Sequence, residues 1–382
     1  MFLEKEGKLI YSYDGETVCI EAWGKDALRV RATKNRSFTG HDWALEAKDA
    51  HAGEVEIFED PSAKGGAFAN MYEGTDTSYG KITNGKIHAV IDSGSVITFY
   101  HEDGRVLLKE HFRRLRDEES MPLNIMGREY SNGVGDNFRI VARFVARKGE
   151  KIFGMGQYQQ HELDLKGCML ELAQRNSQVS VPFYLSSIGY GFLWNNPGVG
   201  QVMFANNGTE WVTESGKEID YLVIAGDTPA EIEENYMTLT GKPPMMPEYG
   251  MGFWQCKLRY WNQEQLLSVA RKYKELGVPL DVIVVDFFHW TKQGEFKFDP
   301  KYWPDVPGMC RELKEMGIQV VVSVWPTVDI YSENFDEMKE KGYLVRTEHG
   351  VPLTMLCGGN EVFFDATNPD ARTYVWEKIK KN

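Results

Sequence analysis

The apolar residues of this chain follow two different patterns. Between residues 8 and 226 they form short stretches in which apolar and polar positions alternate, as in Val96-Ile97-Thr98-Phe99-Tyr100. Glycine-containing turns separate these stretches, at Asp14-Gly15, Asn84-Gly85 and Asp103-Gly104. Short alternating strands joined by such turns, without a helical period, are typical of antiparallel sandwiches. We therefore expect a β-sandwich domain over residues 1–226.

Unbroken apolar runs replace this alternation from residue 248 onward. Strands are predicted at 249–255, 282–285 and 319–325, and amphipathic segments lie between them. Continuous Val and Ile runs indicate parallel strands buried on both faces. A repeated strand–helix unit with polar and aromatic residues at the strand ends predicts a (β/α)8 TIM barrel. Only three such units are found, so residues 248–382 are expected to form an incomplete barrel.

Helix boundaries are marked by capping residues. Thr228, Pro229 and Glu231 form a helix start of the capping-box type, and that helix is predicted to reach about Thr240. A proline-rich stretch follows, so residues 227–247 are interpreted as a connecting helix and linker. Further helix starts are predicted at Asn262, Pro307, Ser332 and Asn368-Pro369.

Composition narrows the choice of partners. The chain has 382 residues and a net charge of −13, and 42% of its residues are hydrophobic. Such an acidic balance argues against nucleic acid and anionic membranes as partners, because both are bound through Lys and Arg. Apolar runs of about 18 residues are absent, and the N-terminus has no apolar leader. We expect a soluble, cytoplasmic protein with a neutral substrate.

Cofactor and metal motifs are missing from the sequence. The five cysteines are scattered without zinc-like spacing, which predicts isolated buried thiols. Gly154-Met155-Gly156-Gln157 lacks the third glycine and the strand–helix context of a dinucleotide site. We predict no cofactor and no metal.

Asp286 is the main candidate for chemistry. It directly follows four apolar strand residues, at the point where a barrel strand leaves the core. A carboxylate there is costly to desolvate unless it is hydrogen-bonded or contacts a ligand. One interpretation is that Asp286 accepts hydrogen bonds from substrate hydroxyls. The alternative is a structural acid bonded to the following loop.

Aromatic residues accompany Asp286 at the predicted rim. Trp325 ends the third strand and either stacks on a sugar ring or plugs the barrel end. Phe287, Phe288, His289 and Trp290 would form a costly exposed patch unless they line a pocket. Trp254 and Arg259 follow the first strand; Arg259 and Lys257 reach the pocket or are solvated. Capping explains four other acids without catalysis, Asp299, Asp305, Asp329 and Asp365.

Five motifs in the right order resemble glycoside hydrolase family 31, the retaining α-glycosidases. They are Phe153-Gly154-Met155-Gly156-Gln157, Pro182-Phe183-Tyr184-Leu185-Ser186-Ser187, Gly189-Tyr190-Gly191-Phe192-Leu193-Trp194-Asn195-Asn196, Phe298-Asp299-Pro300 with Pro304-Asp305, and Phe364-Asp365-Ala366-Thr367-Asn368-Pro369. The resemblance implies a galactose-mutarotase-like sandwich before the barrel and an oligosaccharide substrate. It leaves a homo-oligomer possible.

Within the family, 286–290 and 255–260 resemble the α-xylosidase branch. The resemblance implies hydrolysis of terminal α-linked xylose, with substrate binding by Asp286, Phe287, Phe288, Trp325, Trp254 and Arg259. A bulky aromatic beside the aspartate fills space that the hydroxymethyl of glucose needs, a preference of about 1–3 kcal/mol. An α-glucosidase or transglycosidase of the same family is the alternative.

The catalytic residues of the family find no counterpart here. Family members place their nucleophilic aspartate after the fourth barrel strand and the acid/base further on, so both are expected beyond Asn382. A retaining mechanism needs two carboxyl groups about 5–5.5 Å apart. The resemblance therefore implies an N-terminal fragment that is inactive alone. A non-catalytic sugar-binding module is the alternative of another class.

Overall fold

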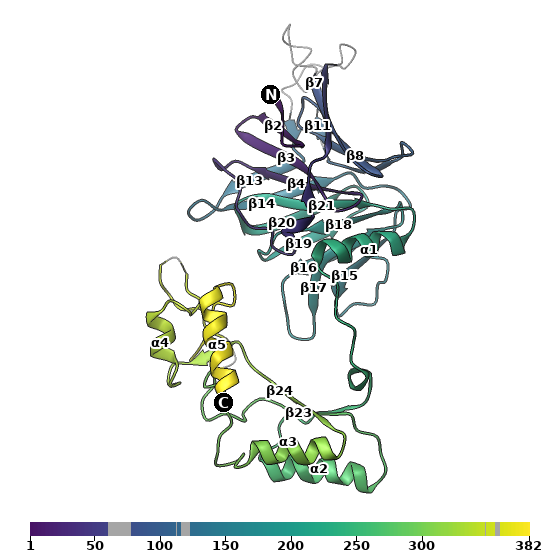
Figure 1. Ribbon diagram of the computed structural model, residues 1–382. Coiled ribbons are helices and arrows are strands. Elements are labelled where there is room, and N and C mark those ends of the chain that lie inside the picture. Colours follow the sequence, from purple (N-terminus) through teal and green to yellow (C-terminus); the bar gives the residue numbers. More distant parts are fainter. Residues whose placement is uncertain (60–77, 112, 116–122, 348, 356–359) are drawn as a thin grey trace. The chain divides into compact units, whose positions relative to one another are not determined.

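The computed structural model describes residues 1–59, 78–111, 113–115, 123–347, 349–355 and 360–382 (Figure 1). The chain divides into two compact units, Met1–Pro243 and Pro244–Asn382. Each unit has hydrophobic clusters of its own, so the two are described one at a time. The two patterns of apolar residues thus belong to separate cores.

The first unit is built from antiparallel strands, as the alternating pattern predicts. The strands are β1 (Phe2–Lys5), β2 (Lys8–Tyr13), β3 (Glu16–Trp23), β4 (Ala27–Thr33), β5 (Ala50–His51), β6 (Glu54–Glu59), β7 (Ser78–Asn84), β8 (Ile87–Ile91), β9 (Ile97–His101), β10 (Val106–Lys109), β11 (Arg113–Leu115), β12 (Leu123–Ile125), β13 (Arg128–Asn132), β14 (Phe138–Phe144), β15 (Ile152–Gln157), β16 (Met169–Leu172), β17 (Val179–Ser186), β18 (Tyr190–Trp194), β19 (Gly200–Phe204), β20 (Thr209–Gly216) and β21 (Ile219–Ala225). A short 3₁₀ turn, Ala47–Asp49, precedes β5.

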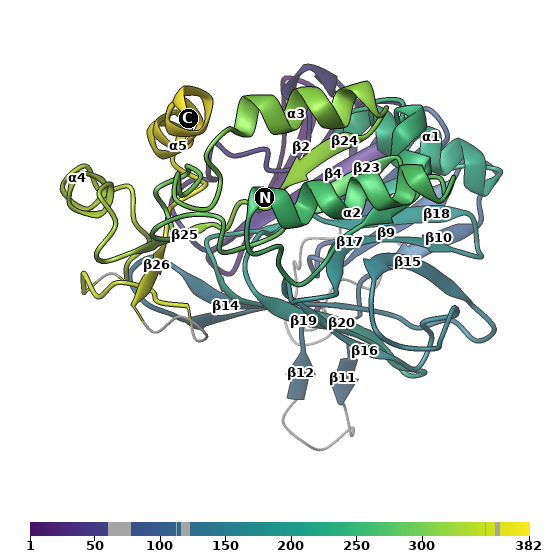
Figure 2. The ribbon, with the colours of Figure 1, turned by 90° about the horizontal axis from the view of Figure 1, so that it is seen from below.

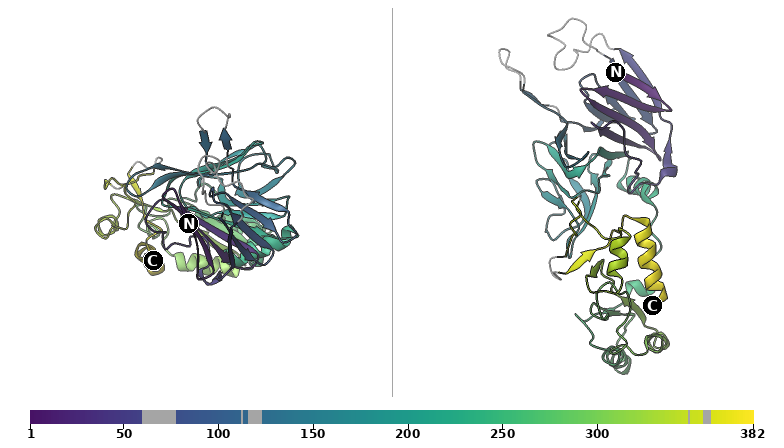
Figure 3. Two further views of the ribbon diagram at one scale, coloured as in Figure 1. Left: turned by 90° about the horizontal axis from the view of Figure 1, so that it is seen from above. Right: turned by 90° about the vertical axis from the view of Figure 1, so that its left-hand side faces the viewer.

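These strands form layered sheets. The largest has the order β1-β2-β3-β4-β21-β18-β17-β15, with β5 paired to β3. Two five-stranded sheets follow the orders β10-β9-β8-β7-β6 and β13-β14-β20-β19-β16, and β11 pairs with β12. Figure 3 shows the purple and blue strands of this unit from two further sides. The predicted β-sandwich is confirmed.

Aromatic rings fill the core of the first unit. The rings of Trp194 and Trp211 are stacked with centroids 5.5 Å apart, and Trp211 lies 5.1 Å from Phe192. Tyr184 stacks on Phe192 at 5.4 Å. Rings at such separations gain from offset contact beyond the apolar area they bury. The motif residues of β17 and β18 therefore serve packing.

The turn between β2 and β3 shows why Asp-Gly pairs mark the hairpins. Asp14 and Gly15 both have left-handed backbones, with φ of 50° and 73°. Two positive φ values in succession match the twist of the flanking strands, as in a type I′ turn. A Cβ at Gly15 would meet nothing within 4 Å, so the backbone angle, and not crowding, favours glycine there.

Helix α1 (Pro229–Thr240) packs on β18 and β21 of the first unit. Thr228 caps it: the Thr228 hydroxyl accepts a hydrogen bond from the Glu231 amide at 3.2 Å. The Glu231 carboxylate in turn accepts one from the Asp227 amide at 3.0 Å. The predicted helix start is confirmed. Ile232 and Leu239 on the apolar side of the helix are buried in a hydrophobic cluster.

The second unit alternates strands and helices. In chain order they are η2 (Glu248–Met251), β22 (Trp254–Gln255), α2 (Gln263–Glu275), β23 (Val282–Val285), α3 (Val306–Glu315), β24 (Gln319–Val322), β25 (Thr327–Asp329), α4 (Phe335–Glu340), β26 (Glu361–Phe363) and α5 (Pro369–Lys381).

Strands β22, β23 and β24 form a parallel sheet in that order, whereas β25 and β26 pair antiparallel. Figure 2 shows α2 and α3 side by side along the strands β23 and β24. This is the start of a TIM barrel, as predicted. Within the described residues, no helix is long and apolar enough to cross a membrane.

Side chains cap the helices of this unit where the sequence indicates. Asn262 Oδ1 accepts from the Gln265 amide at 2.9 Å, and Asp305 Oδ1 accepts from the Gly308 amide at 2.8 Å. The Asn368 side chain accepts from the first amides of α5. The start predicted at Ser332 was too early, because α4 begins at Phe335. The Ser332 hydroxyl there accepts the Asn334 amide in the preceding turn.

The first barrel strand is shorter than predicted. Residues 248–251 form a 3₁₀ turn, and only Trp254 and Gln255 pair with β23. Pro247 precedes this turn, and a Cβ at Gly252 would lie 2.2 Å from the Asp281 carboxylate. Asp281 also accepts from the Phe253 amide at 2.9 Å. At Phe253 this bond to a side chain takes the place of a ladder bond, which explains why the strand is shorter than predicted.

The third strand also differs from the prediction. It ends at Val322 instead of residue 325, since its partner β23 ends at Val285. Three of its four residues are only half-buried and Gln319 is exposed. The expectation of burial on both faces is therefore wrong for this strand among the residues the structure describes.

Candidate functional site

Parallel pairing gathers the residues that follow the barrel strands. Val285 lies opposite Val322, so Asp286 and Ser323 leave their strands side by side. The Ser323 amide still donates to the Val285 carbonyl at 2.9 Å, and the Ser323 hydroxyl donates to Asp286 Oδ1 at 3.1 Å. Chemistry at the carboxyl ends of such strands is typical of this architecture.

One of the two oxygens of the Asp286 carboxylate is fixed by hydrogen bonds. Its Oδ1 accepts from the Ser323 hydroxyl and, at 2.8 Å, from the Phe287 amide. Its Oδ2 meets the Cys256 thiol, with Sγ at 3.8 Å. Burial raises the pKa of the Cys256 thiol, and the charge of Asp286 raises it further, so the thiol stays protonated and donates. Oδ2 retains capacity for further donors.

Three predicted aromatic residues meet beside Asp286. The Phe287 ring lies 4.5 Å from Phe288 and 5.3 Å from Trp325, centroid to centroid. Phe288 is 53% exposed and has a φ of 64°, an unfavourable backbone for a bulky residue. Such strain is found where the surroundings fix a loop for function.

Arg259 joins this group and Trp254 does not. The Arg259 guanidinium lies 5.2 Å from the centroid of the Phe288 ring and 3.4 Å from that of Trp261. The Trp254 indole donates to the Gly250 carbonyl at 3.2 Å. The neighbouring Gln255 bonds Tyr273 of α2, so Trp254 lies on the strand face opposite that helix.

His289 has a structural contact in the loop after β23. It is 5% exposed, and Nδ1 lies 3.1 Å from the Asp286 carbonyl. Its ring packs 4.7 Å from Trp290 and 4.7 Å from Phe298. Burial lowers the pKa of His289, while the Asp286 carbonyl and charge oppose this. His289 is thus a buried loop histidine that is hydrogen-bonded to the backbone.

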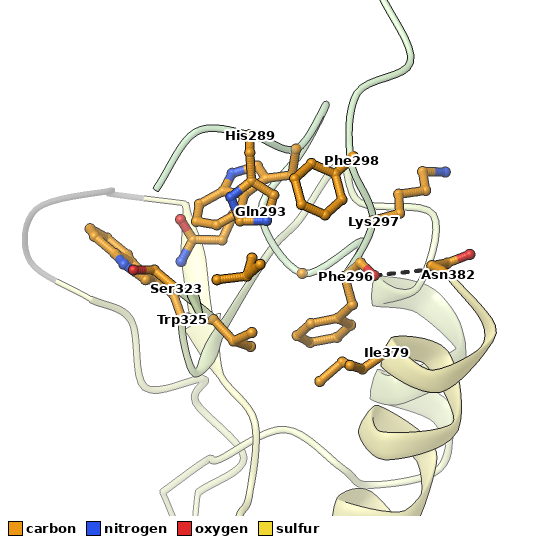
Figure 4. Close-up of a pocket in the computed structure, with 13 residues that line it drawn as sticks. His289, Gln293, Phe296, Lys297, Phe298, Ser323, Trp325, Ile379 and Asn382 are labelled. Carbon is orange, nitrogen blue, oxygen red and sulfur yellow. Dashed lines mark hydrogen bonds between the residues drawn. The ribbon is translucent and has the colours of Figure 1, made fainter. Parts of the chain in front are cut away.

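A mostly apolar pocket of about 150 Å³ adjoins the rim (Figure 4). Trp325 lines it, as do His289 and Trp290 of the predicted aromatic patch, together with Ser323 and Phe296. Ile379 of α5 closes another side. The pocket is thus beside, and not around, the Asp286 carboxylate.

The four acids interpreted as structural bond backbone amides. The Asp299, Asp329 and Asp365 carboxylates accept the amides of Lys301, Tyr331 and Thr367 at 2.9, 2.8 and 2.9 Å, and Asp305 caps α3. These contacts account for the side chains.

Sequence reasoning missed Cys256 and Ser323. Both directly touch the Asp286 carboxylate, and neither was named as a site residue. The available signal was their position: Cys256 directly follows the first predicted strand and Ser323 lies near the end of the third, at the same edge of the sheet as Asp286. A thiol or a hydroxyl at a strand end does not stand out in the sequence as an aromatic or charged side chain does.

The cysteines are less buried than expected. Cys19 is buried, whereas Cys256 and Cys310 are exposed and Cys168 is intermediate. Cys357 lies outside the described residues. Among the residues that the structure describes, no three His, Cys, Asp or Glu side chains gather as a metal site.

Comparison with known proteins identifies the family. Residues 17–202 match the glycosyl hydrolase 31 N-terminal galactose mutarotase-like domain, and residues 243–382 match the family 31 TIM-barrel domain. The chain is 43% identical to an uncharacterized family 31 glucosidase of Pseudescherichia vulneris, over 100% of this chain and 70% of that protein. The chain belongs to glycoside hydrolase family 31. The resemblance inferred from the motifs is confirmed.

Other family 31 relatives are described as α-xylosidases. Alpha-xylosidase A of Aspergillus niger is 30% identical over 96% of this chain and 50% of that protein. The crystal structure of a family 31 α-xylosidase from a soil metagenome, complexed with xylose, is 48% identical with a TM-score of 0.89. The match covers 100% of this chain and 55% of the metagenomic α-xylosidase chain. The chain thus spans between half and 70% of these relatives' length.

Proposed function

We propose that this family 31 chain belongs to a retaining α-glycosidase that releases terminal α-linked xylose from oligosaccharides. The observation that carries the proposal is the half-satisfied carboxylate of Asp286. Oδ1 is occupied by a backbone amide and a hydroxyl, whereas the one donor that meets Oδ2 among the described residues is a weak thiol. An anionic acceptor fixed in this way suits the hydroxyls of a sugar, which then bind through charge-assisted hydrogen bonds.

The preference for xylose rests on Phe287. Its backbone amide donates to Oδ1 of the Asp286 carboxylate at 2.8 Å, so the ring starts directly beside the carboxylate that is proposed to bind sugar. Trp325 and Phe288 pack against that ring and limit its movement. A pentose lacks the hydroxymethyl of glucose and avoids this wall. The two α-xylosidase relatives agree with this choice.

The remaining predicted residues receive supporting roles. Trp325 and the exposed face of Phe288 form the apolar wall of the sugar pocket. Arg259 stacks over Phe288 and is positioned to donate to a neighbouring sugar unit. Trp254 is proposed to contact substrate from the strand face opposite α2. Its indole nitrogen is already bonded, so only its ring is available.

Asp286 is proposed as a binding group and not as nucleophile. Its carboxylate partners are an amide, a hydroxyl and a thiol, so the second carboxyl group of a retaining pair is not one of them. We propose that nucleophile and acid/base are not among residues 1–382. The chain alone is then expected to bind sugar without hydrolysing it, which is the non-catalytic alternative.

An assay against p-nitrophenyl α-glycosides tests the function. A protein that carries this chain at the length of the α-xylosidase relatives is expected to cleave the α-xyloside faster than the α-glucoside or α-galactoside. The 382-residue chain, assayed beside it, is expected to give no turnover. Faster cleavage of the α-glucoside would favour the α-glucosidase alternative, and turnover by the short chain would overturn the assignment of roles.

A further inference from the structure

A second pocket, of about 790 Å³, is lined entirely by residues of the first unit. Its walls come from the loop 35–43 after β4, from residues 136–137, from 196–198 after β18, and from 213–218 in and after β20. The function proposed above uses none of these residues. The pocket is far roomier than the apolar pocket beside Trp325 and can hold more than one sugar ring.

Trp43 projects from the loop that forms one wall. It is 48% exposed, and its ring lies 4.6 Å from that of His41. Its φ is 52°, a left-handed conformation that is strained for a large side chain. An exposed tryptophan held in a strained backbone contributes little to the core, so packing does not explain it. Such strain persists only where the surroundings enforce it.

A buried ion network enforces the conformation of this loop. Arg29, which is 0% exposed, donates to both oxygens of Asp220, at 3.0 and 2.6 Å. The same guanidinium donates to Asp42 Oδ1 at 2.7 Å and to the His41 carbonyl at 3.1 Å. The residues just before Trp43 are therefore tied to a charge in the core.

Asn195 fixes the loop from the other side. Its amide group donates to the Asp42 carbonyl at 3.1 Å and to Asp220 Oδ2 at 2.8 Å. Its Oδ1 accepts from the Ala44 amide at 3.3 Å. The backbone is thus held both before and after Trp43, which leaves the ring as the free part of a rigid platform. Preorganisation of this kind lowers the entropy cost of binding.

The other groups around the pocket are suited to a neutral ligand. Lys217 is paired with Asp136 at 2.7 Å, and Glu218 accepts from the amide and the hydroxyl of Thr39 at 2.7 and 2.9 Å. Asp136 thus compensates the Lys217 charge, the Glu218 carboxylate is hydrogen-bonded to Thr39, and Arg36 adds a guanidinium that can donate to hydroxyls. The lining that remains is rich in amides and hydroxyls, from Asn137, Asn196, Ser37 and Ser215. Aromatic faces combined with such groups suit the apolar faces and hydroxyl rims of sugars.

We propose that this pocket is a second carbohydrate site, which binds a neutral oligosaccharide with one sugar ring stacked on Trp43. The amide and hydroxyl side chains of the facing walls take the sugar hydroxyls. This site is additional to the one around Asp286 and does not require that the latter be an α-xylosidase site. It gives the first unit a binding role besides its packing.

Calorimetric titration of the 382-residue chain tests the proposal, with isomaltotriose and an α-xylosyl-glucose disaccharide as probes. Trp43→Gly is the decisive variant, because it removes the ring and relieves the positive φ. We expect it to weaken binding about tenfold, the loss of one stacking aromatic. Its thermal midpoint should stay equal or rise. Trp376→Gly is the matched control, since Trp376 is 59% exposed on α5, and binding should not change.

The outcomes separate this inference from the proposed function. Sugar binding that survives Asp286→Ala and is weakened about tenfold in Trp43→Gly supports the second site, whether or not the protein cleaves an α-xyloside. Binding that Asp286→Ala abolishes and Trp43→Gly leaves intact overturns it while leaving the proposed function standing. Absence of sugar binding, or binding of inorganic phosphate in its place, also overturns it. A lower thermal midpoint in Trp43→Gly would indicate that Trp43 packs against the protein. If Trp43→Tyr then restored the thermal midpoint but bound no sugar, the proposal would also be overturned.

Discussion

Replacement of Asp286 by asparagine removes the negative charge and keeps the shape of the side chain. The remaining oxygen can still accept from the Phe287 amide and the Ser323 hydroxyl, which lie 2.8 and 3.1 Å from Oδ1. The new amide group takes the place of Oδ2 and faces the Cys256 thiol. An acceptor for sugar hydroxyls is thereby turned into a donor, while the loop keeps its anchors.

The size of the effect follows from the bonds that change. A hydrogen bond to a charged group contributes about 1.5–3 kcal/mol, so losing one such bond to a sugar hydroxyl lowers kcat/KM about 10- to 150-fold. Asp286→Ala also strands the Phe287 amide and the Ser323 hydroxyl, at roughly 1 kcal/mol each. Its loss of activity should exceed that of Asp286→Asn, and its stability should fall as well.

The assay is steady-state cleavage of a p-nitrophenyl α-xyloside by a protein that carries this chain and turns over, with xylose binding as a second readout. Asp299→Ala is the control, because the Asp299 carboxylate bonds the Lys301 amide in a turn at 2.9 Å. That variant should lose stability and keep kcat/KM within about threefold. Equal losses of kcat/KM in Asp286→Asn and Asp299→Ala would refute the reasoning, since Asp286 would then be structural.

Three further predictions concern the second unit. Phe287→Ala should raise kcat/KM for the α-glucoside relative to the α-xyloside about tenfold; an unchanged ratio would remove Phe287 from the selectivity argument. Because burial lowers the pKa of His289 from 6.5, the unfolded chain binds the extra proton more readily, and stability should fall as pH drops below 6.5. His289→Gln should flatten that slope in urea unfolding followed by tryptophan fluorescence, and an unaltered slope would assign it to other groups. Asp305→Ala should lower the free energy of unfolding by about 1 kcal/mol through the lost Gly308 cap, without changing sugar affinity.

Features set by neighbouring residues were predictable from the sequence. Thr228, Asn262 and Asp305 cap helices through amides three residues away, so the pattern contains both partners. The Asp14-Gly15 turn depends on backbone preference alone. The division between alternating and continuous apolar runs also survives, because it reports which faces of a strand are buried.

The start of the first barrel strand was predicted wrongly because a residue outside that segment determines it. Asp281, which precedes β23, accepts the Phe253 amide and occupies the space that a side chain at position 252 would need. The apolar residues around position 250 do not predict this contact. A distant carboxylate thus decides where pairing begins.

The site was predictable to the extent that strand ends define it. Asp286, Phe287 and Trp325 meet because β23 and β24 are parallel and in register. The place of Trp254 was harder to predict, since alternation assigns faces only once the strand start is known. Cys256 and Ser323 could be identified as site residues only once the strand pairing was known, because that pairing brings their thiol and hydroxyl to the Asp286 carboxylate.

One competition experiment tests the central claim most directly. Equimolar α-xyloside and α-glucoside with the same leaving group are mixed with a protein that carries this chain at the length of its family 31 relatives, and the released sugars are followed by proton NMR. The account predicts free xylose in roughly tenfold or greater excess over glucose, appearing first as the α-anomer because the mechanism retains configuration. Glucose released as fast as xylose, or xylose appearing first as the β-anomer, would contradict it.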